Sequence, residues 1–165
     1  MEKIKITEQI KENAKRLMAL TGDSENCCIG EVAFTQYLYE NEVLHTPLLE
    51  QTDSKNKRHG IILHMQSGPN KKLITATYPD PQCWKMMIPQ GQLDKYFDYY
   101  IGLKINDGHV EIWGYTEPTG FHLETHGFNY ESKPTLWKWL KDLKPISTLL
   151  AQAAFEEDLK EMEIK

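Results

Sequence analysis

Two oppositely charged side chains, Lys104 and Glu111, face each other in the most clearly predicted element of the sequence, a hairpin over residues 99–115. Asp107-Gly108 marks its two-residue turn, because a type I′ turn needs positive φ at both central positions. A lysine beside a carboxylate could be a catalytic lysine next to a metal ligand. It could equally be an exposed cross-strand ion pair worth under about 1 kcal/mol, and the commonness of such pairs favours this second interpretation.

A second group suited to metal binding consists of two histidines, His122 and His126, with a carboxylate between them. Four residues apart on a helix, two imidazoles could hold zinc. The residue order differs from the HExxH zinc motif, however, and Gly120 and Gly127 flank the pair. The flanking glycines favour a polar loop, so no metal site is predicted here.

The three cysteines, Cys27, Cys28 and Cys83, are odd in number and have no CxxC spacing. Adjacent cysteines rarely bridge each other because the geometry is strained. The sequence therefore predicts free thiols in a reducing, cytoplasmic compartment. Residues 1–5 lack the apolar stretch of a secretion signal. No run approaches the roughly 18 apolar residues that a membrane helix needs, so no membrane association is predicted.

Basic side chains concentrate in one part of the chain, around residues 55–59 and at the turn that follows. If two strands over 61–65 and 73–78 bring these segments together, they form a patch that attracts phosphate groups. The patch would consist of Lys55, Lys57, Arg58, Lys71 and Lys72. The alternative is that these charges serve solubility alone.

Two helices are predicted in the N-terminal region, residues 1–45. Apolar side chains recur at helical spacing over 4–20 and over 29–44. Ser24 or Asn26 could cap the second helix. The polar residues 50–59 then predict a loop.

The sheet is predicted over residues 60–117. Strands over 61–65 and 73–78 are followed by a long loop over 79–95 and by the hairpin. In the hairpin register the apolar residues of the two strands share one face, which is assigned to the core. Those core residues are Ile101, Leu103, Ile105, Val110 and Ile112. The expected sheet is a mostly antiparallel meander of about four strands.

Helices are predicted again over residues 133–163. A short helix bearing Leu136, Trp137 and Leu140 starts near Pro134, and a second one starts at Pro145. On the first helix, Trp137 and Trp139 would point to different sides. The whole pattern predicts an α/β or α+β fold in which helices flank a central sheet.

Length and charge limit the class of protein. The chain has 165 residues, 40% of them hydrophobic, which predicts a single domain over 1–165. Its 19 basic and 24 acidic residues give a net charge of −5, which excludes a histone-like protein that coats nucleic acid by bulk attraction. Part of the acidic excess lies in residues 156–163, so a locally basic surface remains compatible with this charge.

Several segments resemble the restriction-endonuclease-like PD-(D/E)XK nuclease superfamily. Thr75-Ala76-Thr77-Tyr78-Pro79 looks like a stretch of some bacterial members, and residues 97–104 and 110–115 look like their strand pair. Residues 140–146 resemble a closing segment of the same proteins. Glu31 stands where these proteins carry a helical glutamate. The resemblance implies a restriction-endonuclease-like fold.

The sequence departs from this superfamily at the metal site. The Glu-x-Lys position reads Lys72-Leu73-Ile74, and no aspartate occurs in strand 61–65. A lysine in place of a metal-binding glutamate would repel Mg²⁺. The resemblance therefore implies a catalytically degenerate nuclease-like domain without a cofactor. Its expected role is that of a nucleic-acid-associated or complex-forming subunit, with a protein partner or a second copy, in a defence or mobile-element system.

Two alternatives remain open. In an active, divergent nuclease, Glu31, Asp98 and Glu111 would hold Mg²⁺, and Lys104 would polarise the attacked phosphate of DNA or RNA. This hypothesis needs the carboxylates to converge within about 2.0–2.6 Å of one ion. The other alternative is a protein-interaction domain with no role in nucleic-acid binding.

Overall fold

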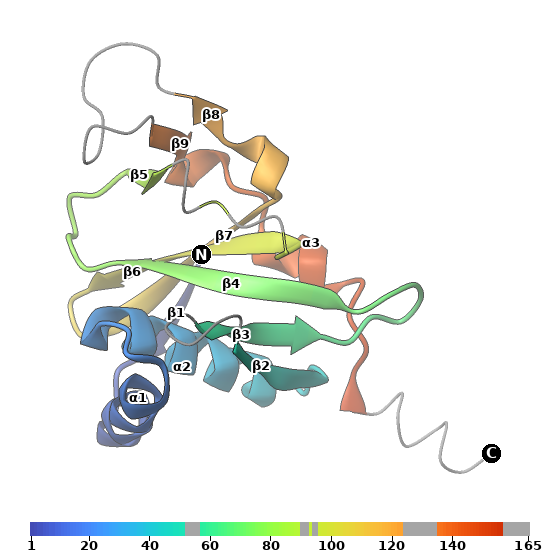
Figure 1. The fold of residues 1–165 in the computed structure, drawn as a ribbon, viewed down its shortest axis with the longest axis horizontal. Coiled ribbons are helices and arrows are strands. Elements are labelled where there is room, and N and C mark those ends of the chain that lie inside the picture. Colours follow the sequence, from blue (N-terminus) through green and yellow to red (C-terminus); the bar gives the residue numbers. More distant parts are fainter. Residues whose placement is uncertain (52–56, 90–92, 94–95, 124–134, 157–165) are drawn as a thin grey trace.

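The chain folds into three layers, with two helices on one side of a large sheet and a small sheet on the other (Figure 1). The computed structural model describes residues 1–51, 57–89, 93, 96–123 and 135–156. This arrangement confirms the predicted α/β or α+β class. The described helices are too short or too polar to cross a lipid bilayer.

The first layer consists of helices α1 (Glu8–Thr21) and α2 (Glu25–Glu40). The Thr7 hydroxyl caps α1 by accepting a hydrogen bond from the Ile10 amide at 3.2 Å, and Ser24 caps α2 through the Cys27 amide at 3.3 Å. Both predicted helices and the Ser24 cap are confirmed. Their boundaries differ, because residues 2–5 form a strand and α2 ends four residues before the predicted 44.

The large sheet has six strands within the described part of the chain, in the order β1-β7-β6-β4-β3-β2. Their bounds in this order are Glu2–Lys5, His109–Thr116, Tyr99–Asn106, Lys71–Tyr78, Lys57–Leu63 and His45–Gln51. The predicted four-strand meander differs from this sheet in two ways. β1 and β2 extend it at the two edges, and β4 pairs with β6 in parallel. The remaining pairings are antiparallel, as predicted.

The hairpin β6–β7 has the predicted register, with Lys104 opposite Glu111 and Ile105 opposite Val110. Asp107 and Gly108 have φ of 51° and 70°, as the type I′ turn requires. The register shifts after Gly102, which pairs with Gly114 while Leu103 pairs with Ile112. The hairpin therefore has a bulge, at Gly102 and Leu103 on β6.

A small sheet forms from segments that the sequence predicted as a loop and as a helix. Its strands, in the order β5-β9-β8, are Lys85–Pro89, Thr135–Trp139 and His122–Leu123. β5 lies in the segment predicted as the loop 79–95, and β9 lies in the segment predicted as a helix starting at Pro134. Pairing with β5 satisfies the backbone of β9, and side chains then alternate between two faces, so this tertiary contact overrides the helical spacing.

Two further predictions are partly wrong: the polar loop over 50–59 and the C-terminal helices over 133–163. Residues 45–51 and 57–63 form the antiparallel pair β2–β3, and residues 52–56 lie outside the described part. After β9 come short 3₁₀ turn η3 (Leu140–Asp142) and helix α3 (Ile146–Leu150). Another 3₁₀ turn, η2 (Pro118–Gly120), follows β7. Residues 157–165 also lie outside the described part.

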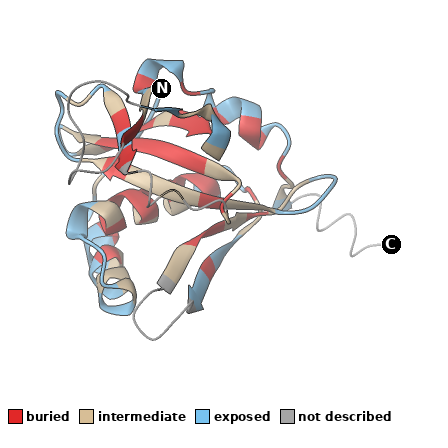
Figure 2. Cartoon of the chain, turned by 45° about the horizontal axis from the view of Figure 1, so that its top comes forward, coloured by how far each residue is buried: buried red, intermediate tan, exposed pale blue. Residues whose placement is uncertain are grey.

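Two hydrophobic cores cover the two faces of the large sheet. The first packs α2 residues such as Phe34 and Leu38 against Leu103 and Ile112. The second packs Met86 of the small sheet, with Leu140 and Leu143, against Tyr100 of β6. Figure 2 shows the buried residues concentrated in the central strands and on the helix surface that faces them.

Helix α2 approaches the large sheet closely at Gly30, which faces Thr77 of β4. A Cβ atom built on Gly30 would lie 1.9 Å from the Thr77 hydroxyl oxygen and 2.9 Å from its Cβ. Real Cβ atoms do not approach other atoms so closely. Glycine at this position therefore lets the helix lie directly on the sheet.

We expect the substitution Gly30→Ala to destabilise the protein by about 1–3 kcal/mol in urea unfolding, because overpacking outweighs the roughly 1 kcal/mol by which alanine favours a helix. The double variant with Thr77→Ala should recover part of the loss, since it removes the nearest atom. Thr77→Ala alone is the control, because its buried hydroxyl has no hydrogen-bond partner within the described structure. A Gly30→Ala variant more stable than the parent would contradict the close packing.

Candidate functional site

The structure separates the four residues that the sequence proposed as a catalytic group. Leu103 and Ile112 belong to the core on the α2 side, so Lys104 and Glu111, which alternate with them, point to the opposite face. Glu31 lies on α2, on the helix side of the sheet. Glu31 and Glu111 are therefore on opposite sides of the large sheet.

Asp98 lies apart from the other three. Its carboxylate accepts a hydrogen bond from the Lys72 amide at 2.8 Å, which fixes it at the start of β6. Lys104 follows six residues later, roughly 20 Å along an extended chain. Within the described ranges no three His, Cys, Asp or Glu side chains are grouped as a metal site would need. The described carboxylates thus do not fit the Mg²⁺ of the active-nuclease hypothesis.

Lys104 and Glu111 are not the exposed ion pair that the sequence predicted. They are 2% and 5% exposed, because the segment leading into the small sheet covers this face. The Lys104 Nζ lies 4.1 Å from the ring centre of Trp84 and 5.4 Å from that of Trp113. The Glu111 carboxylate accepts a hydrogen bond from Trp113 Nε1 at 3.2 Å. Aromatic rings thus replace water around the buried ammonium group.

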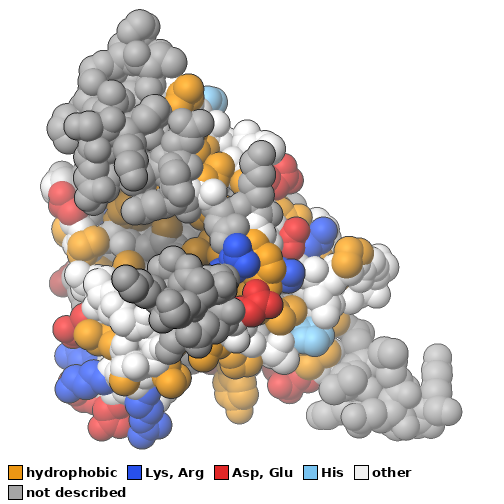
Figure 3. Space-filling view, viewed as in Figure 1, with side chains coloured by type: hydrophobic (Ala, Val, Ile, Leu, Met, Phe, Trp, Pro, Cys, Tyr) orange, Lys and Arg blue, Asp and Glu red, His pale blue; other side chains and the backbone are white. Residues whose placement is uncertain are grey.

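Part of the predicted basic patch does converge. The Arg58 guanidinium carbon lies 4.3 Å and the Lys72 Nζ 3.8 Å from the ring centre of Tyr96. Lys71 is the neighbour of Lys72 on β4, so its side chain points to the other face. Lys55 and the side chain of Lys57 lie outside the described residues. Figure 3 shows basic side chains beside hydrophobic surface on the face seen in Figure 1.

The outer face of the small sheet carries aromatic and basic side chains that the sequence analysis did not group. We call this surface the tryptophan face, and its members are Lys85, Met87, His122, Trp137 and Trp139. Cross-strand pairing places Lys85 beside Trp139, and both Met87 and His122 beside Trp137. Met87 and Trp139 are 41% and 36% exposed.

Lys85 connects the two tryptophans of this surface. Its Nζ lies 5.0 Å from the ring centre of Trp137 and 4.8 Å from that of Trp139, and the two rings are 5.6 Å apart, edge to face. His122 packs on Trp137 with ring centres 4.9 Å apart, and His126 lies outside the described residues. The alternation Trp-Lys-Trp was the signal for a strand, because a strand places both tryptophans on one face.

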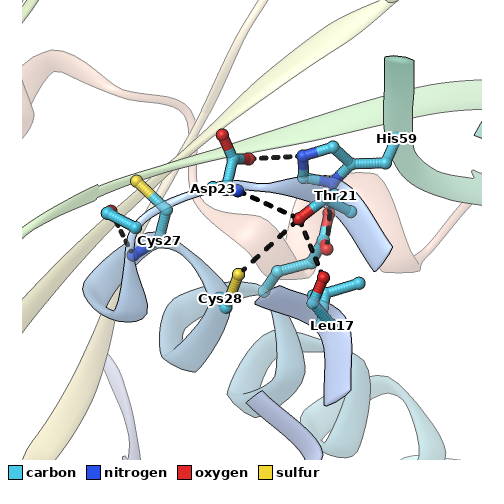
Figure 4. A network of polar contacts seen from close by, with 8 residues as sticks. Leu17, Thr21, Asp23, Cys27, Cys28 and His59 are labelled. Atoms are coloured by element: carbon cyan, nitrogen blue, oxygen red, sulfur yellow. Dashed lines mark hydrogen bonds and ion pairs between the residues drawn. The ribbon is translucent and has the colours of Figure 1, made fainter. Parts of the chain in front are cut away.

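A network of polar contacts joins the helices to β3 (Figure 4). His59 lies between two carboxylates: its Nδ1 is 3.2 Å from both oxygens of Glu31, and its Nε2 contacts Asp23. Hydrogen bonds to Asp23 and then to Glu31 raise the pKa of His59 to about 10, and the bond to His59 lowers the pKa of Asp23. The protonated imidazole therefore donates to both carboxylates at neutral pH. It has no free nitrogen to act as a base.

Thr21 supports this network from the end of α1. Its hydroxyl donates to the Leu17 carbonyl at 2.9 Å and accepts from the Asp23 amide at 3.3 Å, which holds Asp23 toward His59. Cys28 lies 4.0 Å from the same hydroxyl, and burial raises the pKa of its thiol to about 11. That thiol is therefore protonated at neutral pH. All three cysteines are in described segments and are free, as predicted.

Comparison with protein-family models, curated proteins and solved structures finds no match to this chain. The resemblance to the nuclease superfamily thus stays a hypothesis based on sequence segments.

The His59 network makes the stability of the fold depend on pH. A pKa raised from 6.5 to about 10 means that His59 contributes fully below pH 6.5, and that this contribution is lost as the pH rises to 10. The pKa of Asp23 is lowered from its usual value of 3.8. Asp23 therefore stabilises the fold above pH 3.8, and this contribution is lost as the pH falls below that value. We expect the free energy of unfolding to decline between pH 6.5 and 10, and a His59→Gln variant to lack this decline.

At pH 6, His59→Gln should destabilise the fold by about 2 kcal/mol. This is less than the roughly 3–5 kcal/mol lost when a fully buried ion pair is broken, because solvent screens the charge of Asp23. Glu31→Gln should cost more than Asp23→Asn, since the Glu31 side chain is 8% exposed and that of Asp23 is 47% exposed. Urea unfolding from pH 4 to 10 measures all four proteins. Parallel pH profiles of the parent and His59→Gln would refute the role of this network.

Proposed function

We propose that the chain is a non-catalytic binding subunit that holds single-stranded nucleic acid on the tryptophan face. The observation that carries the proposal is the placement of Trp137 and Trp139 side by side, with Lys85 over both rings. Trp139 is exposed and Trp137 is half-buried. Aromatic rings that reach the surface stack on bases of any sequence, and a neighbouring ammonium group neutralises the phosphate backbone. The resemblance to nuclease segments supports the same class of partner.

The charge distribution favours binding of nucleic acid through local contacts over attraction by the net charge of the protein. The net charge of −5 repels a polyanion at long range, so contacts must come from local cations. Lys85 supplies one, and Lys141, whose Nζ is 6.0 Å from the Trp139 ring centre, supplies a second. Two phosphate contacts give a salt dependence of about −1.4 in log K per log salt, from about −0.7 for each contact on a single strand.

The Tyr96 cluster, defined by Arg58, Lys72 and Tyr96, would contribute a second contact to the backbone of a longer strand. Arg58 also lies 3.9 Å from Glu50, so part of its charge is compensated within the protein. Lys72 is therefore the better phosphate ligand of the two. Among the described residues, only Arg58 and Lys72 of the predicted basic patch lie together.

We expect an oligothymidylate of twelve nucleotides to quench tryptophan fluorescence with a Kd of about 0.1–1 mM at low salt, because two stacked bases supply roughly 4–6 kcal/mol. Trp139→Ala and Lys85→Gln should each weaken binding at least fivefold. Matched controls are Tyr39→Ala, an aromatic residue 71% exposed on α2, and Lys15→Gln, an exposed lysine on α1. Equal losses in variants and controls, or no saturable binding, would refute the proposal.

A protein partner is the competing occupant of the tryptophan face, because tryptophans also dominate protein interfaces. Sedimentation of the same variants separates the two outcomes. Self-association that Trp139→Ala abolishes, without oligonucleotide binding by the parent, would replace nucleic acid with a second copy of the chain.

We also expect the purified protein to leave DNA and RNA uncut with Mg²⁺ or Mn²⁺, because Glu31 and Glu111 lie on opposite sides of the large sheet. Agarose and denaturing gels of plasmid, single-stranded DNA and RNA measure this. Metal-dependent cleavage that Glu111→Ala abolishes would establish the active nuclease instead.

A further inference from the structure

A cleft of about 560 Å³ lies between helices α1 and α2 and the hairpin β2–β3. Figure 2 shows the hairpin diverging from the helices. The residues that line the cleft place it on the helix side of the large sheet. This volume is within the roughly 300–1,000 Å³ of small-molecule sites. The cleft shares no residue with the tryptophan face, so its role is independent of the proposed function.

The walls of the cleft are predominantly apolar. Leu17 and Val32 come from the helices, and Pro47 and Ile61 come from the hairpin. Three further apolar side chains that line it are exposed to solvent: Leu20 is 54%, Leu49 51% and Tyr39 71% exposed. A bound apolar molecule would remove this surface from water, at about 25 cal/mol per Å².

The charged side chains of the cleft determine which polar head group a bound apolar molecule would need. The ionisable groups that line the cleft are Arg16, Glu31, His45 and His59. Glu31 pairs with His59 at 3.2 Å, and the same imidazolium also bonds Asp23, which does not line the cleft. His45 Nδ1 is bonded to the Val43 carbonyl at 2.8 Å. Arg16 of α1 is the positive charge that remains for a ligand, since no ion pair of the described residues includes it.

We propose that this cleft binds an amphipathic carboxylate, with its hydrocarbon chain between the helices and the hairpin and its carboxylate on Arg16. A guanidinium group suits this head group, because it binds a carboxylate with two parallel hydrogen bonds. Arg16 is exposed, so the head group stays at the mouth of the cleft and the chain extends inward. The network of Glu31, His59 and Asp23 closes the polar side of the cleft with a net charge of −1, so the carboxylate binds at Arg16 and not at this side.

Three ten-carbon probes that differ only in the head group test this proposal: decanoate, decylammonium and decan-1-ol, each below its solubility or micelle limit. Isothermal titration calorimetry should show decanoate binding at least tenfold more tightly than the other two. Arg16→Gln should weaken decanoate to the level of decan-1-ol and leave decan-1-ol unchanged. Lys15→Gln is the matched control, a neighbouring exposed lysine that does not line the cleft.

A second variant tests the cavity and not the charge. Leu49→Trp should fill the mouth of the cleft and abolish binding of all three probes, while the melting temperature without ligand shows that the fold persists. Equal affinity for the three head groups, tighter binding of decylammonium, or an equal loss in Lys15→Gln would overturn the proposal. Oligothymidylate binding by Arg16→Gln should equal that of the parent, so the two proposals fail separately.

Discussion

The hairpin β6–β7 is buried on both of its faces, and the arrangement of the whole molecule follows from this burial. One face carries Leu103 and Ile112 against α2, and the other carries Tyr100 against the small sheet. A strand buried on both sides cannot leave a charge in contact with water. Lys104 is accommodated because Trp84 and Trp113 lie beside its ammonium group, and Glu111 because Trp113 and Asn106 donate to it. The small sheet thus has a structural role as a cover, in addition to carrying the tryptophan face.

The same sheet divides the surface into two regions with different chemistry. The helix side carries the His59 network and the cleft, whereas the other side carries the tryptophan face and the Tyr96 cluster. In the His59 network a single imidazolium joins the α1–α2 junction, α2 and β3. This contact holds β3 against the helices, and Glu31 and His59 also line the cleft. The proposed ligand cleft therefore shares His59 with the network that joins the helices to β3, and the large sheet separates the tryptophan face from both.

Local features were predictable from the sequence because their causes are local. The Asp107-Gly108 turn set the hairpin register, and that register correctly placed Leu103 and Ile112 in a core. Ser24 capped α2 as expected. Predictions failed where a strand depends on pairing with another strand: Thr135–Trp139 is a strand because β5 lies beside it, and His45–Gln51 is a strand because β3 does. The partner β5 was itself unrecognised, and only residues 61–63 of the partner β3 lay in a predicted strand, so the local pattern alone favoured a helix or a loop.

Residue types in the sequence determined that this chain forms helices and a sheet, where the central hairpin turns and which residues fill its core. Only the tertiary structure decided which polar groups meet. His59 contacts Asp23 and Glu31 across separations of 36 and 28 residues, and Glu31 and Glu111, grouped by sequence reasoning, lie on opposite sides of a sheet. A turn or a helix cap depends on residues that are neighbours in the chain, whereas a site depends on the order in which strands join a sheet. That order rests on backbone pairing between segments whose own sequences do not specify a partner.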